Sequence, residues 1–155
     1  MAIPRNLGNL ASGADTSGVL GTTKGGTGTS TGSLANCTVD GTVAVGYRTI
    51  PQNSQSAAYT LVLADSGKQI FHPSADTTPR TWTIPANGSV AFPVGTAVTF
   101  INQNGAGVIT IAITTDTMRL AGAGTTGSRT LAANGIATAI KVTSTEWIIS
   151  GTGLT

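Results

Sequence analysis

The chain has 155 residues, of which 39% are hydrophobic, 5% aromatic and only 9% charged, and its formal net charge at pH 7 is +2. An ordinary soluble domain carries about 25% charged residues, so this composition predicts a surface poor in charge. The basic residues are scattered singly, which argues against nucleic-acid binding. No apolar run approaches the ~18 residues of a membrane span, and no segment has the pattern of a signal peptide.

The abundance of Gly, Ser, Thr, Ala and Asn disfavours long helices, whereas β-branched residues are plentiful. A β-rich surface with little charge is an aggregation hazard for a free monomer. Permanent burial of that surface in an oligomer or a larger assembly removes the hazard. The composition therefore favours a structural protein.

Residues 1–58 are predicted to form an extended attachment and assembly arm rich in Gly, Ser and Thr. The segment has few large apolar residues and no sustained period, so it cannot bury enough surface alone to offset its ordering entropy. We expect its order to come from contacts with other chains. The predicted apolar anchors of this attachment are Leu7, Leu10, Val19 and Leu20.

The arm contains the stretch VLGTTKGGTGTSTGSL at 19–34, which superficially suggests a phosphate-binding loop. A P-loop places its lysine directly after the last glycine, whereas Lys24 precedes Gly25 and Gly26. A dinucleotide fingerprint needs a third glycine where this chain has Thr31. The sequence therefore predicts an extended segment and no nucleotide cofactor.

From Tyr59 onward, short alternating runs separated by turn sequences predict β-strands. The run at 80–84 alternates Thr with Trp and Ile, the run at 109–113 places three isoleucines on one face, and Asn87-Gly88 signals a tight turn. Residues 135–143 alternate isoleucine, threonine and valine with alanine and lysine. About seven to nine such strands predict an all-β fold, an antiparallel sandwich or barrel over residues 59–155.

Candidate catalytic groups are scarce, because the chain has one histidine, His72, one cysteine, Cys37, and one glutamate, Glu146. We predict that His72 is a strand-end residue and not a general base, and that Cys37 forms no internal disulfide. A lone histidine and a lone cysteine cannot complete a zinc site within one chain, although three copies of His72 on a threefold axis remain an alternative. No enzyme activity, cofactor or metal is predicted.

Asp65, Asp76 and Asp116 each lie beside a predicted turn, where aspartate commonly accepts backbone hydrogen bonds. Trp82 and Trp147 lie on predicted strands and are interpreted as core or interface anchors. The alternative interpretation makes these tryptophans platforms that stack on a host glycan, with Asp76 or Asp116 as polar partners.

Two regions resemble virion proteins of tailed bacteriophages. The stretch LGTTKGGTGTSTGSLAN at 20–36 is similar to a GGTG segment that recurs in tail fibres. The motifs at Leu63–Lys68, Thr83–Thr96 and Trp147–Gly151 resemble a small β-domain module of phage fibre and appendage proteins. Together these regions cover most of the chain.

The resemblance implies an intertwined homotrimer and a structural role in the virion, as a short tail fibre or tail appendage attached through its arm. One alternative is a capsid decoration or head-fibre protein, and another is a module that binds host glycan. The expected partners are further copies of the chain and another virion protein of the tail adaptor, tail tube or capsid, with a cell-surface glycan as a third candidate. The expected location is the virion, after assembly in the bacterial cytoplasm.

Overall fold

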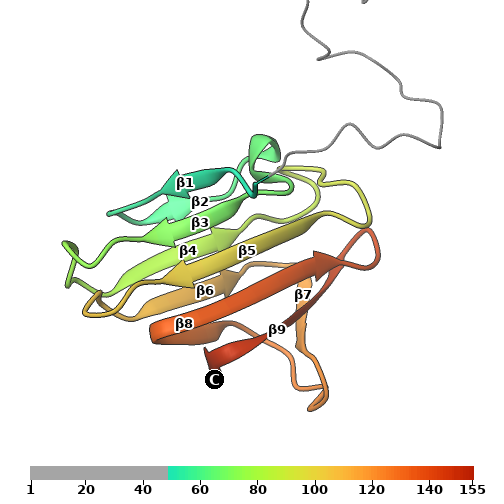
Figure 1. Ribbon diagram of the computed structural model, residues 1–155. Coiled ribbons are helices and arrows are strands. Elements are labelled where there is room, and N and C mark those ends of the chain that lie inside the picture. The colour runs from blue at the N-terminus through green and yellow to red at the C-terminus, as the bar shows by residue number, and fades with distance from the viewer. Residues whose placement is uncertain (1–48) are drawn as a thin grey trace, which may run out of the picture. The chain divides into compact units, whose positions relative to one another are not determined.

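The computed structural model describes residues 49–155 (Figure 1). The predicted anchors Leu7, Leu10, Val19 and Leu20 and the single cysteine lie outside the described residues. Within residues 49–155 the all-β prediction is confirmed. A single 3-10 turn, η2 (Leu63–Asp65), accompanies nine strands: β1 (Gln52–Ser54), β2 (Tyr59–Thr60), β3 (Gln69–His72), β4 (Arg80–Ile84), β5 (Ala97–Asn102), β6 (Ile109–Ile113), β7 (Thr117–Leu120), β8 (Arg129–Lys141) and β9 (Glu146–Leu154).

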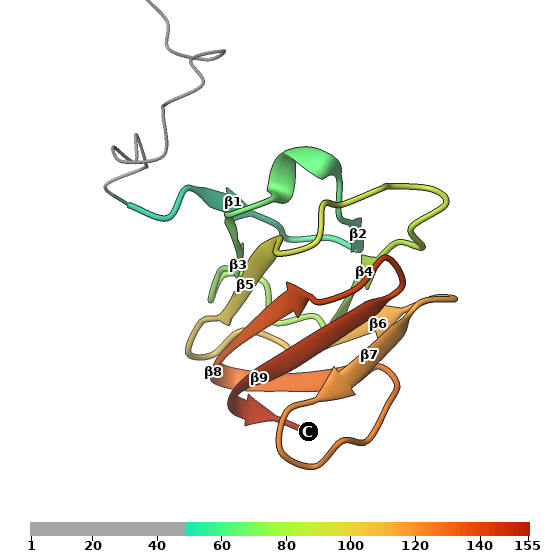
Figure 2. The ribbon, with the colours of Figure 1, turned by 90° about the vertical axis from the view of Figure 1, so that its right-hand side faces the viewer.

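The chain winds so that successive strands belong alternately to two halves of one curled sheet. Strands β1, β3 and β5 are parallel neighbours in one half, and β2, β4 and β6 are parallel neighbours in the other. The long strand β8 joins the halves, because Arg129–Leu131 pair with β6 and Ile136–Ile140 pair with β5. Figure 2 shows the two halves on opposite sides of the core, with β8 and β9 closing one end.

The expected antiparallel arrangement is wrong for most of the sheet, because five of the eight strand pairs are parallel. Only the pairs β5–β8, β6–β8 and β8–β9 are antiparallel. Alternation of apolar and polar residues is the same in either kind of pair, so the sequence pattern did not distinguish them. The turn at Asn87-Gly88 exists, but the connection that contains it leads to the opposite half and forms no hairpin.

The core lies between the two halves and is built from the inward positions of the alternating strands. Trp82 and Ile84 on β4 face this core while Thr81 and Thr83 face outward. Burial of each large apolar side chain contributes on the order of 1.5–3 kcal/mol. The other large members of the core are Leu61, Ile70, Phe92, Val98, Phe100, Ile109, Ile111, Met118, Leu131, Trp147 and Ile149.

The β-domain begins before Tyr59, which corrects the predicted boundary between residues 58 and 59. Strand β1 pairs in parallel with β3, and the Gln55 N–H donates a hydrogen bond to the Phe71 carbonyl (2.9 Å). Strand β1 has the sequence QNS, which contains no apolar residue and therefore carries no strand signal. Its side chains contribute polar contacts, including a hydrogen bond from Asn53 to the buried carboxylate of Asp65 (2.9 Å).

Candidate functional site

One outer face of the sheet carries large apolar side chains in register, and we call it the apolar face: Phe71, Ile101, Ile136, Ile140 and Ile148. Phe71 on β3, Ile101 on β5 and Ile136 on β8 are direct neighbours across the strands. A second row joins Ile140 on β8 to Ile148 on β9. The exposed fractions of Ile136, Ile140 and Ile148 are 48%, 44% and 37%. These side chains are therefore presented to the outside and not to the core.

Among the paired positions of the apolar face, ionisable side chains occur only at the rim formed by β7 and β9. The row between the two apolar rows consists of Gln69, Thr99, Thr138 and Ser150. The hydroxyl oxygens of Thr99 and Thr138 are hydrogen-bonded to each other at 3.0 Å. Arg119 on β7 lies beside Ile148 at the rim, where its Nε donates to Glu146 Oε1 at 2.8 Å.

The outer face of the other half carries threonines, and we call it the threonine face: Thr60, Thr81, Thr83, Thr110 and Thr130. Thr81, Thr110 and Thr130 form one row across β4, β6 and β8. Thr60 and Thr83 form the next row with Ala112. The paired positions of this face lack ionisable side chains, so both broad outer surfaces of the described domain are poor in charge away from the β7–β9 rim.

The charged and titratable side chains cluster at the strand ends, and the most connected group surrounds His72. His72 is completely buried at the end of β3. Its Nε2 lies 3.0 Å from Asp76 Oδ2, and its Nδ1 lies 3.0 Å from Asn102 Oδ1 and 3.1 Å from the Gly107 carbonyl oxygen. Arg80 in turn donates from Nε and Nη2 to the two carboxylate oxygens of Asp76, at 2.7 and 3.1 Å.

The hydrogen-bond partners of His72 are all acceptors. Asn102 donates from Nδ2 to the carbonyls of Gly107 (2.9 Å) and Leu131 (3.0 Å), which fixes its Oδ1 toward the imidazole. The other partners of the ring are a carbonyl and a carboxylate, so each ring nitrogen has an acceptor within hydrogen-bond distance. Both nitrogens are thus engaged within the fold and neither faces solvent. The cluster connects β3, β5, β8 and the β3–β4 turn, so His72 links several elements of the fold.

The Arg80 guanidinium, followed by His72, holds the pKa of Asp76 well below its ordinary value of 3.8. A carboxyl with a depressed folded-state pKa stabilises the fold above about pH 4 and loses that contribution as the pH falls toward the folded value. We therefore expect Asp76→Asn to lower the melting temperature at pH 7, and the difference from wild type to shrink below about pH 4. Thermal melts at pH 7 and pH 3 measure this, and an equal difference at both pH values would contradict it.

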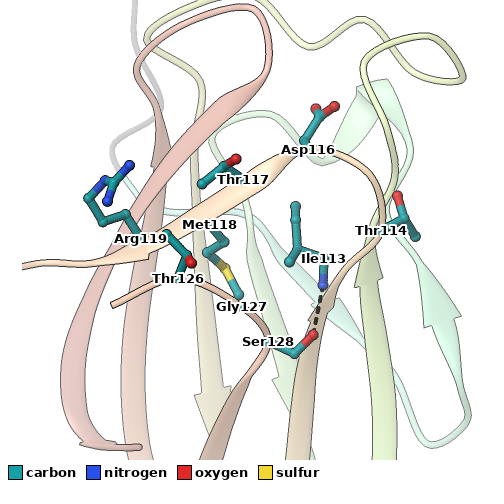
Figure 3. Close-up of a pocket in the computed structure, with 9 residues that line it drawn as sticks. All are labelled: Ile113, Thr114, Asp116, Thr117, Met118, Arg119, Thr126, Gly127 and Ser128. Carbon is teal, nitrogen blue, oxygen red and sulfur yellow. Dashed lines mark hydrogen bonds between the residues drawn. The ribbon is translucent and has the colours of Figure 1, made fainter. Parts of the chain in front are cut away.

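A polar pocket of about 460 Å³ opens between the end of β6 and β7 (Figure 3). Asp116 lies on its wall, and its Oδ2 accepts a hydrogen bond from the Asn87 N–H at 3.0 Å. Ser128 Oγ accepts from the Ile113 N–H at 3.2 Å (Figure 3). No aromatic ring is among the lining residues, which also include Thr114, Thr117, Met118, Arg119, Thr126 and Gly127.

Trp82 and Trp147 are both completely buried, so the alternative interpretation, in which they stack on a glycan, is wrong. The Trp82 ring packs edge-on against His72 (5.8 Å between centroids), and its Nε1 donates to the Ala57 carbonyl at 3.2 Å. The Trp147 ring packs edge-on against Phe92 (5.6 Å). Both serve as core anchors, which was the other interpretation of their alternating strands.

Lys141 is a buried cation that sequence reasoning missed. Its side chain is 1% exposed, its Nζ donates to Asn87 Oδ1 at 2.6 Å, and the ammonium lies 5.7 Å from the centre of the Trp147 ring. The amide and the aromatic face compensate part of the cost of burying this charge. A lone lysine in an alternating strand is usually exposed, so the sequence offers no signal for it.

Comparison with protein-family models, with curated proteins and with solved structures finds no match to this chain. Over residues 49–155, no three His, Cys, Asp or Glu side chains are grouped to hold a metal ion. The same part of the chain has no helix that is long and apolar enough to cross a membrane.

Proposed function

We propose that this protein is a structural component of a bacteriophage virion, a short trimeric tail fibre or tail appendage attached through the part of its predicted arm that precedes the β-domain, residues 1–48. The observation that carries the proposal is the shortage of ionisable side chains on both outer sheet faces of the described domain, whose paired positions hold only Arg119 and Glu146, at the β7–β9 rim. Monomeric soluble proteins rarely expose wide apolar surfaces, and such surfaces usually mark contacts with other molecules. A particle in which copies and neighbouring proteins cover these faces is consistent with this surface.

The resemblance of residues 20–36 and of the three motifs in the β-domain to phage fibre proteins supports the same proposal. It favours a tail location, with a capsid decoration or head-fibre protein as the alternative. A tail location implies attachment to a tail adaptor or tail tube protein, and a capsid location implies attachment to a capsid protein. Copy number and position in a particle map would decide between these two locations. Burial of Trp82 and Trp147 removes the stacking surfaces on which host-glycan binding depended, so glycan binding is not part of the proposal.

Particle attachment is tested by replacing Leu7, Leu10, Val19 and Leu20 together with serine. Each buried anchor contributes on the order of 1.5–3 kcal/mol, so we expect the quadruple variant to disappear from purified particles. The amount of protein that sediments with particles, measured by quantitative mass spectrometry, checks this result.

A matched control replaces four arm residues whose side chains are already polar, in the variant T22S/T23S/T27S/T29S. It should remain on particles at the wild-type copy number. If the variant without apolar anchors also remains, the β-domain and not the arm holds the protein on the virion.

A further inference from the structure

We propose that Lys141 and Asn87 form an intramolecular isopeptide bond, in which the lysine Nζ replaces the side-chain amide nitrogen of the asparagine and Asp116 transfers a proton. Such a bond is a covalent modification of the chain and does not depend on the proposed function. The two side chains already touch, because Lys141 Nζ lies 2.6 Å from Asn87 Oδ1. The carbonyl carbon of Asn87 is one bond of about 1.2 Å from that oxygen, so the amine lies within about 4 Å of the carbon that it would attack.

The fold holds the two reacting groups in place. The N–H of Lys141 on β8 donates to the Thr96 carbonyl (2.9 Å), and its own carbonyl accepts from the Gly95 N–H (2.8 Å). These bonds fix β8 to the end of the β4–β5 connection, and Asn87 lies near the start of the same connection. The N–H of Asn87 is in turn held by Asp116 Oδ2 at 3.0 Å. Groups held in contact in this way react as if at a high effective concentration.

The reaction would remove a charge from the interior of the domain. Lys141 is 1% exposed, and its ammonium lies 5.7 Å from the centre of the Trp147 ring, against which Phe92 packs edge-on. An ammonium has three donors, and within the described part of the chain its one side-chain hydrogen bond is to Asn87. A buried charge with incomplete hydrogen bonding is costly, whereas the amide that replaces it carries no charge.

The step conserves atoms and charge without any further reactant. One proton of the Lys141 ammonium passes to the Asp116 carboxylate, and the free amine attacks Asn87 Cγ. The Nζ–Cγ bond forms, the Cγ–Nδ2 bond breaks, and one hydrogen stays on the nitrogen of the new amide. The departing nitrogen receives the two protons that Lys141 gives up, one of them through Asp116, and leaves as an ammonium ion.

Asp116 is placed for this transfer because it is a buried carboxylate that is hydrogen-bonded to the reacting residue. It also lies on the wall of the polar pocket between the end of β6 and β7 (Figure 3). This pocket offers the departing ammonium ion a route to solvent.

The test measures the tryptic peptides of the folded, full-length protein by mass spectrometry. Trypsin does not cleave after a lysine whose amine is acylated. We therefore expect a branched peptide that joins residues 81–119 to residues 130–155 and is lighter by one ammonia, about 17 Da, than its two parts. Separate peptides 81–119, 130–141 and 142–155, each at full mass, would overturn the proposal.

One competing reaction gives the same loss of mass. The backbone nitrogen of Gly88 can close on the Asn87 side chain to form a cyclic imide, which also releases ammonia. The peptide of residues 81–119 would then be lighter but linear, and residues 130–141 would appear as an ordinary peptide. That outcome would also overturn the proposal.

Three variants test the assigned roles, with far-UV circular dichroism to establish that each is folded. Lys141→Met keeps an unbranched side chain without an amine and should abolish the branched peptide, whereas Lys68→Met is the control and should retain it. Asp116→Asn keeps an acceptor for the Asn87 N–H and should slow formation on the order of 100-fold, measured at equal times after expression begins. Formation at the wild-type rate in Asp116→Asn would overturn the role of Asp116. The wild-type peptides decide the proposal even if a variant does not fold.

Discussion

Replacement of Trp82 by alanine is expected to lower the free energy of unfolding by about 3–5 kcal/mol, which is the usual cost of deleting a large buried aromatic side chain. Trp82 is completely buried between the two halves of the sheet. Its ring lies edge-on to His72 and 6.2 Å from Phe100 between centroids. Loss of this side chain leaves a cavity against both neighbours. Urea denaturation of the full chain, followed by circular dichroism, measures the change.

The two tryptophans provide a matched comparison through substitution by phenylalanine. The indole N–H of Trp82 donates to the Ala57 carbonyl, whereas the buried Nε1 of Trp147 has no hydrogen-bond partner. An unsatisfied buried donor costs about 1–3 kcal/mol, so its removal offsets part of the lost packing. We expect Trp147→Phe to be less destabilising than Trp82→Phe. The reverse order would show that the Trp147 N–H is satisfied in solution.

Replacement of Gly151 by alanine is expected to cost about 3 kcal/mol, at the upper end of the range for an overpacked site. Gly151 on β9 faces Ala137 on the antiparallel strand β8. A Cβ atom at residue 151 would meet the carbonyl oxygen of Ile136 and the Cα and Cβ of Ala137. Two of these three atoms belong to the backbone, so the strands themselves would have to separate. Thermal and urea denaturation check the expected loss.

Gly88 is the control for this substitution, because a Cβ atom there would have no neighbour within 4 Å. Gly88→Ala should change the free energy of unfolding by less than about 0.5 kcal/mol, as is usual for an exposed site. Equal losses at both positions would indicate that general backbone effects of glycine replacement, and not the approach of β8 to β9, determine the result.

Sequence periodicity located the strands whose inward side chains are large and apolar. The strand at 80–84 and the isoleucine strand at 109–113 both appear where alternation predicted them. Alternation fixes which residues share a face but does not determine which face is buried. In β8 the small residues Ala137 and Ala139 face the core, and Ile136 and Ile140 face outward. The apolar face was therefore not foreseen.

Other features depend on contacts between residues that are distant in the sequence. His72, Asn102 and Leu131 come together because β3, β5 and β8 are neighbours in the sheet, and no local sequence pattern predicts these contacts. Strand β1 likewise cannot be predicted from its own sequence, because its polar residues form a strand only through pairing with β3. Parallel pairing depends on the path of the connections, which alternation within a strand does not encode.

The bridging position of β8 makes closure of the sheet depend on synthesis through Lys141. Strands β5 and β6 meet through β8, which begins only at Arg129. A polypeptide that ends before this residue has both halves of the sheet without the strand that joins them, and their inner edges remain unpaired. During translation, the β-domain can close only after β8 has left the ribosome. Products that end before Arg129 therefore lack the only strand that pairs with both halves of the described sheet.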